Sequence, residues 1–176
     1  MNQPMITTRE NLAVLGATGS IGDSTLELVR LHRDRYRVYA LSGFSQIDKL
    51  LSLCQEFQPE FVCVAVEYVD EFRQKLTQHD LTTTVLSGDE GLVRIASAKA
   101  VDTVVAAIVG AAGLSSTLAA ARSGKRILLA NKESLVMAGH LVMAAAREAG
   151  AVSLPIDSEH NAIPALTCGV SMSSTS

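Results

Sequence analysis

The chain has 176 residues, of which 48% are hydrophobic and 4% aromatic, and its formal net charge is −3. This length fits one domain of ordinary size and the start of a second. The sequence contains no basic tract, which argues against nucleic acid or an anionic membrane as a partner. It also shows no basic and apolar leader and no apolar run that would cross a bilayer. We therefore expect a soluble, cytoplasmic protein.

Segments typical of strands and helices alternate along the chain. Strands are predicted at residues 12–15, 36–42, 61–65, 83–86, 103–107, 126–130 and 151–155. Helices are predicted at residues 24–29, 46–56, 67–78, 88–98, 114–123 and 134–149. Repeated β-α-β units with short turns predict the α/β class, with a doubly wound, mostly parallel Rossmann-like sheet. Ligands of such sheets bind beyond the carboxyl ends of the strands, at the point where the strand order reverses.

The first turn carries three glycines, Gly16, Gly19 and Gly22, directly after the apolar segment 12–15. We expect Gly16 to allow the sharp turn, Gly19 to let backbone amides approach phosphates, and Gly22 to let the helix pack close to the sheet. The alternative is a turn that only connects strand to helix. Three apolar residues are expected to face the core: Ile21, Leu28 and Val29. The pattern favours a bound dinucleotide.

The segment after the second predicted strand indicates which dinucleotide is bound. It reads Ser42-Gly43-Phe44-Ser45, with no carboxylate before Asp48. A carboxylate here would hold a ribose 2′-hydroxyl and repel a 2′-phosphate. Ser42, Ser45 and the backbone of Gly43 are candidate donors to such a phosphate, so NADP(H) is favoured. The alternative is that these residues only turn the chain.

Charged residues follow the strand predicted at 126–130. Lys132 and Glu133 follow the carboxyl end of this strand, where they could contact a ligand. Ser134 is expected to cap the next helix. An ordinary helix start would explain Asn131, Glu133 and Ser134. It gives no reason for Lys132 at the positive end of a helix, so a ligand contact is favoured.

A second acidic pattern follows the last predicted strand. Asp157 and Glu159 are two positions apart, so in an extended chain both carboxylates point the same way. Oxygen ligands suit Mg²⁺ or Mn²⁺, although the same pattern also occurs on solvated surfaces. His160 is expected to be structural or to support the site from outside.

The remaining polar candidates are the cysteines Cys54, Cys63 and Cys168, whose spacing fits no metal site. Cys54 and Cys63 lie among apolar residues. We expect them to be core residues of a protein from a reducing compartment.

Four stretches together, residues 16–22, 106–114, 128–136 and 155–163, resemble the 1-deoxy-D-xylulose 5-phosphate reductoisomerase family. The resemblance runs from about residue 10 to Ile163. It implies an enzyme of the non-mevalonate isoprenoid pathway. Such an enzyme rearranges 1-deoxy-D-xylulose 5-phosphate and reduces it with NADPH to 2-C-methyl-D-erythritol 4-phosphate. A homodimer is implied for a full-length member.

The resemblance also implies roles for individual residues. The cofactor contacts would be Thr18, Gly19, Ser20, Ile21, Gly43, Asn131 and Glu133. The catalytic, substrate-binding residues would be Lys132, Ser158 and Glu159. The ligands of Mg²⁺ or Mn²⁺ would be Asp157 and Glu159. Many members carry a basic residue and Asn after Gly43, where this chain has Phe44 and Ser45.

The domain prediction has three parts. Residues 1–155 form an NADPH-binding domain and residues 156–163 begin a catalytic, metal-binding domain. Residues 164–176 are unlike the family, and we expect an aberrant, disordered tail that arises from a frameshift. A third metal-binding carboxylate and a substrate-phosphate site would follow in the family, so the chain alone is expected to be inactive. The alternatives are an NADP-dependent dehydrogenase of the aspartate-semialdehyde type and a non-catalytic NADP-binding module.

Overall fold

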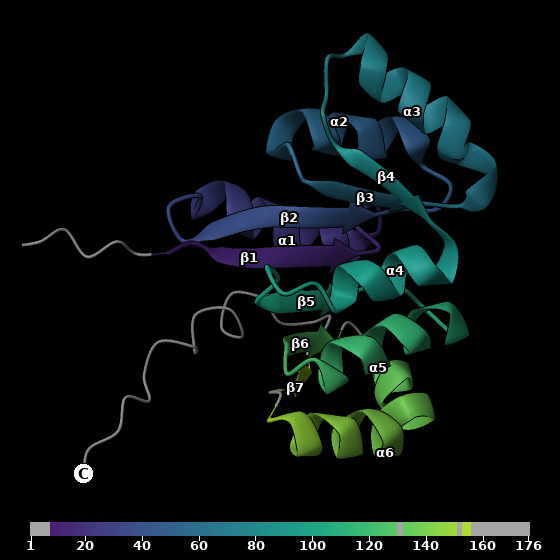
Figure 1. The fold of residues 1–176 in the computed structure, drawn as a ribbon. Coiled ribbons are helices and arrows are strands. Elements are labelled where there is room, and N and C mark those ends of the chain that lie inside the picture. Colours follow the sequence, from purple (N-terminus) through teal and green to yellow (C-terminus); the bar gives the residue numbers. More distant parts are fainter. Residues whose placement is uncertain (1–7, 130–131, 151–152, 156–176) are drawn as a thin grey trace, which may run out of the picture.

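The computed structural model describes residues 8–129, 132–150 and 153–155. Within these residues seven strands form one sheet in the order β4-β3-β2-β1-β5-β6-β7, with every neighbouring pair parallel (Figure 1). The strands are β1 (Glu10–Leu15), β2 (Tyr36–Ser42), β3 (Phe61–Val64), β4 (Thr84–Ser87), β5 (Thr103–Ala106), β6 (Arg126–Leu129) and β7 (Ser153–Pro155). The helices are α1 (Ser20–Leu31), α2 (Ile47–Phe57), α3 (Val69–Gln78), α4 (Gly88–Ala96), α5 (Leu114–Arg122) and α6 (Lys132–Ala149). The predicted doubly wound parallel sheet is confirmed.

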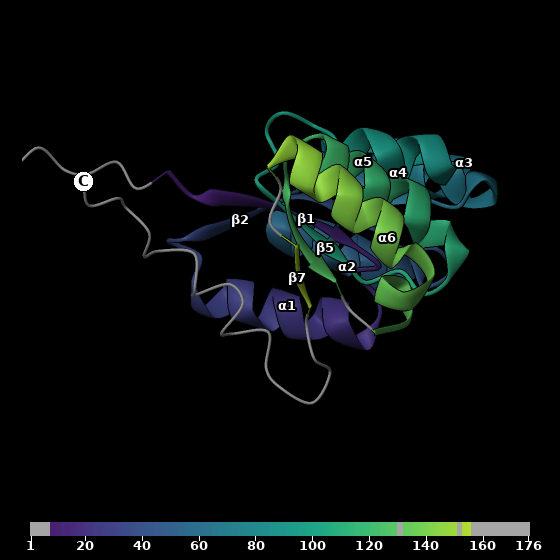
Figure 2. The same cartoon turned by 90° about the horizontal axis from the view of Figure 1, so that it is seen from below.

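The sheet is buried on both faces. Along β1, Leu12 and Val14 pack into one hydrophobic core with residues of α1, α2 and α3. Ala13 and Leu15 point the other way, into a second core shared with α4, α5 and α6. Figure 2 shows α4, α5 and α6 on one side of the sheet and α1 on the other. Successive strand residues face opposite sides, so burial of both faces requires the near-continuous apolar strands seen in the sequence.

Most boundaries differ from the prediction by one or two residues, and α1 begins at Ser20 where residue 24 was expected. A separate 3₁₀ turn, Val66–Tyr68, precedes α3, where one continuous helix was expected. Helix α6 begins at Lys132, so Ser134 lies inside its first turn and the prediction that Ser134 caps it is wrong. The sequence has two polar residues near this helix start, Asn131 and Ser134. Asn and Ser are both favoured at the N-cap, so residue type alone did not fix where the helix begins.

The expected inward face of α1 is correct at two of its three positions. Leu28 and Val29 are buried, but Ile21 is only half-buried. Ile21 lies in the first turn of α1, at the carboxyl edge of the sheet. Thr25 and Leu26 are buried in the turns that follow.

Cys54 and Cys63 are buried free thiols, as expected of core residues. Burial raises the pKa of each thiol to about 12. None of the helices in the described residues has the length and apolar character needed to span a membrane.

The order of the strands creates one place where neighbouring connections diverge. From β1 the chain continues to β2, β3 and β4 on one side, and β5, β6 and β7 are added on the other side. The connections that follow β1 and β5 therefore leave the sheet in opposite directions. A crevice is expected beyond the carboxyl ends of these two adjacent strands.

Candidate functional site

An open cleft of about 350 Å³ lies at this position. It is formed by the loops that follow β1, β2 and β5. Its lining residues are Gly16, Thr18, Gly19, Gly43, Phe44, Ser45, Ala107, Ile108, Val109 and Ala112. The cleft thus lies at the edge of the sheet that the sequence pattern indicated for a ligand.

Gly16 begins the loop after β1 in a conformation that favours glycine, with φ at +84°. A Cβ atom added there would lie 2.7 Å from the carbonyl oxygen of Ala107, on the neighbouring loop after β5. The amide of Gly16 donates to Ser42 Oγ at 2.9 Å, and the amide of Ala17 donates to the Ser42 carbonyl at 2.8 Å. The loop is therefore held between the ends of β2 and β5.

The other two glycines differ in what surrounds them. A Cβ atom added at Gly22 would lie 2.5 Å from the carbonyl oxygen of Ala17, so the close packing is against the glycine loop and not, as expected, against the sheet. A Cβ atom added at Gly19 would meet only the Gly16 carbonyl oxygen, at an ordinary 3.6 Å. Gly19 lines the cleft. No contact with the described protein requires glycine at this position, so its exposed backbone is open to the cleft.

The start of α1 has the properties of an anion-binding site. Gly19 is the N-cap, and none of the described side chains forms a capping hydrogen bond there. In an α-helix the amides of the first turn, here Ser20, Ile21 and Gly22, have no acceptor within the helix. The positive end of the helix dipole adds to their attraction for a phosphate group.

The end of β2 corrects part of the prediction for the 2′-phosphate. Ser42 is 1% exposed and its hydroxyl oxygen accepts from Gly16. The amide of Gly43 donates to the carbonyl of Cys63 at 3.1 Å. Neither is placed to donate to a ligand, because Ser42 is buried and the amide of Gly43 already donates to β3. Phe44 and Ser45 are exposed and line the cleft.

Two residues of the second helix reach the glycine loop, and sequence reasoning missed both. Lys49 Nζ donates to the Thr18 carbonyl at 2.9 Å and to Asp23 Oδ2 at 2.7 Å. Gln46, the N-cap of α2, donates from Nε2 to the same Thr18 carbonyl at 3.3 Å. The only signal in the sequence was a lysine one turn after the loop that follows β2.

The loop after β5 supplies the opposite wall of the cleft. Val109 is 70% exposed there. A 3₁₀ turn, Ala111–Gly113, leads into α5, and the hydroxyls of Ser116 and Thr117 donate to the Gly113 carbonyl at 3.0 and 2.7 Å. These hydrogen bonds satisfy the Gly113 carbonyl where the turn joins α5.

The remaining predicted site residues lie further along the chain. Lys132 and Glu133 are the first two residues of α6, which follows β6 at the same edge of the sheet. The other predicted residues of this region lie outside the described residues: Asn131, Asp157, Ser158, Glu159, His160 and the tail 164–176. Within the described part of the chain no group of three His, Cys, Asp or Glu side chains could hold a metal ion.

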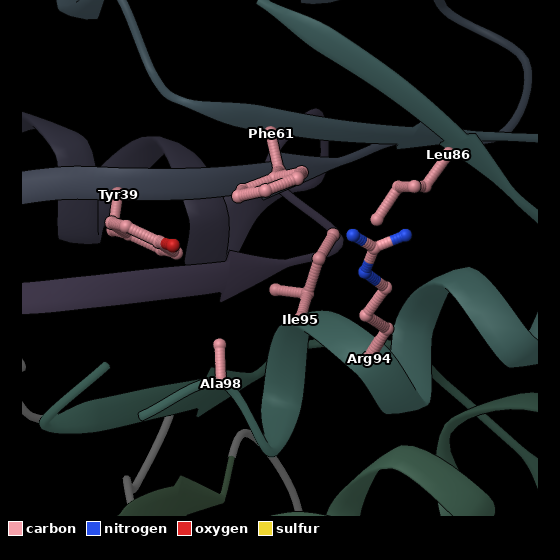
Figure 3. A pocket seen from close by; sticks show the side chains of 6 residues that line it. All are labelled: Tyr39, Phe61, Leu86, Arg94, Ile95 and Ala98. Carbon is pink, nitrogen blue, oxygen red and sulfur yellow. The ribbon is translucent and has the colours of Figure 1, made fainter. Parts of the chain in front are cut away.

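A second cavity, of about 250 Å³, lies between the sheet and α4 (Figure 3). Figure 3 shows its lining residues: Tyr39, Phe61, Leu86, Arg94, Ile95 and Ala98. Tyr39 and Phe61 contact each other at 5.7 Å between ring centroids, and the Arg94 guanidinium lies 5.6 Å from the centre of the Phe61 ring. None of the predicted site residues lines it, so the first cleft is the stronger functional candidate.

Comparison with known proteins agrees with this geometry. The family model for 1-deoxy-D-xylulose 5-phosphate reductoisomerase matches residues 12–139. A reductoisomerase of that name from Psychrobacter sp. strain PRwf-1 is 58% identical over 154 residues, which are 88% of this chain and 38% of the relative.

Two solved structures are also similar. A structure of DOX-P reductoisomerase in complex with NADPH, fosmidomycin and magnesium is 66% identical with a TM-score of 0.83, over 88% of this chain and 38% of that one. The reductoisomerase of Zymomonas mobilis in complex with NADPH is 41% identical with a TM-score of 0.81, over 90% of this chain and 41% of that one.

The chain spans about two fifths of the length of these relatives. Within that span the family model covers β1 from Leu12 on, every strand from β2 to β6, the glycine loop and the cleft beside it. On the match of sequence and fold, this chain belongs to the 1-deoxy-D-xylulose 5-phosphate reductoisomerase family.

Proposed function

We propose that the chain binds NADPH and is the cofactor-binding part of a 1-deoxy-D-xylulose 5-phosphate reductoisomerase. The reaction is the NADPH-dependent rearrangement and reduction of that sugar phosphate to 2-C-methyl-D-erythritol 4-phosphate. One observation carries the proposal: the uncapped start of α1 opens into a cleft at the switch point of a parallel sheet. Relatives that are 66% and 41% identical have been solved in complex with NADPH.

The residues present fit the phosphates of the cofactor. The amides of Ser20 and Ile21 are directed along the axis of α1 toward the cleft, where the pyrophosphate would lie. Thr18 and Gly19 line the same cleft, and the absence of a side chain at Gly19 lets the phosphates approach the backbone. Gly43 forms the part of the cleft beside the adenosine ribose.

We propose that the residues that contact the nicotinamide cofactor and the substrate lie at the same edge of the sheet. NADPH supplies the hydride that reduces the rearranged substrate. Asn131 and Glu133 contact the cofactor, and Lys132 binds the substrate, since α6 begins at the carboxyl edge next to β6. A lysine at the start of a helix adds its charge to the positive helix dipole, which favours an anionic substrate there.

The metal site is proposed on the residues that follow β7. Asp157 and Glu159 hold Mg²⁺ or Mn²⁺, and Ser158 and Glu159 bind the substrate. Two carboxylates on one side of an extended segment are a donor set that suits hard cations. Residues 1–155 are then the NADPH-binding domain, residues 156–163 begin the catalytic domain, and residues 164–176 are a tail that does not belong to it.

The cellular compartment and the partners of the protein are part of the same proposal. Free buried thiols at Cys54 and Cys63 favour the reducing cytoplasm. The net charge of −3 gives no support for a nucleic-acid partner. A homodimer is proposed for the full-length enzyme.

The cofactor proposal is tested by titrating the purified polypeptide with NADPH and following the fluorescence of the nicotinamide. We expect saturable binding. A folded polypeptide, as judged by circular dichroism, that gave no binding would contradict the proposal.

Oxidation of NADPH in the presence of the sugar phosphate and Mn²⁺ tests the reaction. We expect binding without turnover from the 176-residue polypeptide, because Asp157 and Glu159 alone do not complete a metal site. Clear turnover would overturn that expectation and would show that these residues suffice.

A further inference from the structure

We propose that Lys49 is the cation that recognises the 2′-phosphate of NADPH and thereby selects NADPH over NADH. The inference rests on the proposed binding of NADPH. It assigns the selectivity to a residue of α2 that lies outside the loop expected to carry it.

The position of the 2′-phosphate follows from the fold. In dinucleotide-binding sheets the adenosine ribose lies beyond the end of the second strand, and a nearby basic side chain accommodates the 2′-phosphate. Here that end is the segment 43–45, which lines the cleft. Phe44 and Ser45 are uncharged, so the loop itself supplies no cation. Between Gly43 and Leu53 the sequence contains a single basic residue, Lys49.

Lys49 lies where the loops after β1 and β2 meet. Its Nζ is 2.9 Å from the carbonyl oxygen of Thr18, a residue that lines the cleft. A Cβ atom added at Gly43 would lie 3.1 Å from Cγ2 of the same Thr18, so the two loops are in contact at this point. The Lys49 side chain is 37% exposed; it does not itself line the cleft but contacts Thr18, which does.

The charges around Lys49 leave it able to turn toward a phosphate. Its present partner is Asp23, at 2.7 Å, whose side chain is 47% exposed. A phosphate group carries up to two charges and three acceptor oxygens, so it competes well with one exposed carboxylate. The other nearby acid, Asp48, is paired with Lys75 of α3 at 2.9 Å.

The loop itself would remain in place when Lys49 turns. Gln46 donates to the Thr18 carbonyl independently, at 3.3 Å, and an ammonium group has three donors to share. Lys49 can therefore keep its bond to Thr18 while it exchanges Asp23 for the ligand. This separates recognition of the 2′-phosphate from simple support of the loop.

The test compares two cofactors that differ only by this phosphate. The dissociation constants of NADPH and NADH are measured for the unaltered polypeptide and for Lys49→Gln, with adenosine 2′,5′-bisphosphate and adenosine 5′-monophosphate as competing probes. Loss of a charge-assisted hydrogen bond should raise the dissociation constants of NADPH and the bisphosphate by about ten- to a hundredfold. The dissociation constants of NADH and the monophosphate should change by less than about twofold. Lys99→Gln, which removes an exposed lysine just before β5, at the edge of the sheet opposite the cleft, is the matched control and should change none of them.

Two further variants keep the result decisive if Lys49→Gln folds poorly. Lys49→Arg keeps the cation and should keep the preference for NADPH. Asp23→Asn removes the competing carboxylate and should tighten the binding of NADPH more than that of NADH.

The possible outcomes separate the two proposals. Equal weakening of both cofactors in Lys49→Gln would mean that Lys49 only supports the loop, and an unchanged preference would mean that it plays no part; either result overturns the inference. Absence of NADPH binding to the unaltered folded polypeptide would instead refute the proposed function, and the inference with it.

Discussion

The replacement Gly16→Ala tests whether the glycine loop is built as the structure indicates. An alanine here would have to keep φ near +84°, which costs about 1–2 kcal/mol for a residue with a Cβ atom. That Cβ would also lie 2.7 Å from the Ala107 carbonyl oxygen and 2.9 Å from its carbon, and relief of such overpacking costs about 1–3 kcal/mol. The free energy of unfolding should therefore fall by about 2–5 kcal/mol, a large part of the stability of a typical domain.

Gly19→Ala is the matched control, three residues along the same loop. Its φ is −87°, and its added Cβ would meet only one atom, at 3.6 Å. Its free energy of unfolding should fall by no more than about 1 kcal/mol, the cost of alanine at an N-cap, whereas its NADPH affinity should fall because the methyl group enters the cleft. Urea unfolding followed by circular dichroism measures the first quantity and a fluorescence titration the second. Equal stability of the two variants would refute the reasoning about Gly16.

Two further predictions concern stability and reactivity. The side-chain hydrogen bond from Arg30 to Glu56, at 2.7 Å, lowers the pKa of that carboxyl, so the bond stabilises the fold above the unfolded pKa and is lost as the pH falls through the folded pKa. Glu56→Gln should lower the free energy of unfolding by about 1 kcal/mol or less at neutral pH, because the pair is exposed, and urea titrations should show that difference closing below about pH 4. Burial raises the pKa of the Cys54 and Cys63 thiols to about 12, so a Cys168→Ser variant should react with a thiol reagent only after denaturant is added. Rapid reaction of the folded variant would show that these thiols are accessible.

The sequence by itself determined the architecture and the place of the candidate site. Alternating strand and helix patterns predicted a parallel, doubly wound sheet, because apolar periodicity and turn residues report local conformation. The glycine loop between β1 and α1 was predicted for the same reason. The apolar run Leu12–Leu15 of β1 places successive side chains in two separate cores, one on each face of the sheet.

Only the tertiary structure decided which groups remain available for a ligand. Ser42 and Gly43 read as donors in the sequence, yet Ser42 accepts from the glycine loop and the amide of Gly43 donates to β3. Lys49 approaches Thr18 from 31 positions away along the chain, and Gly22 packs on the loop instead of the sheet. Composition and spacing predict where a backbone turns or pairs, but the partners of a polar group are set by contacts between distant segments. Those contacts exist only once the sheet and both of its helical layers are assembled.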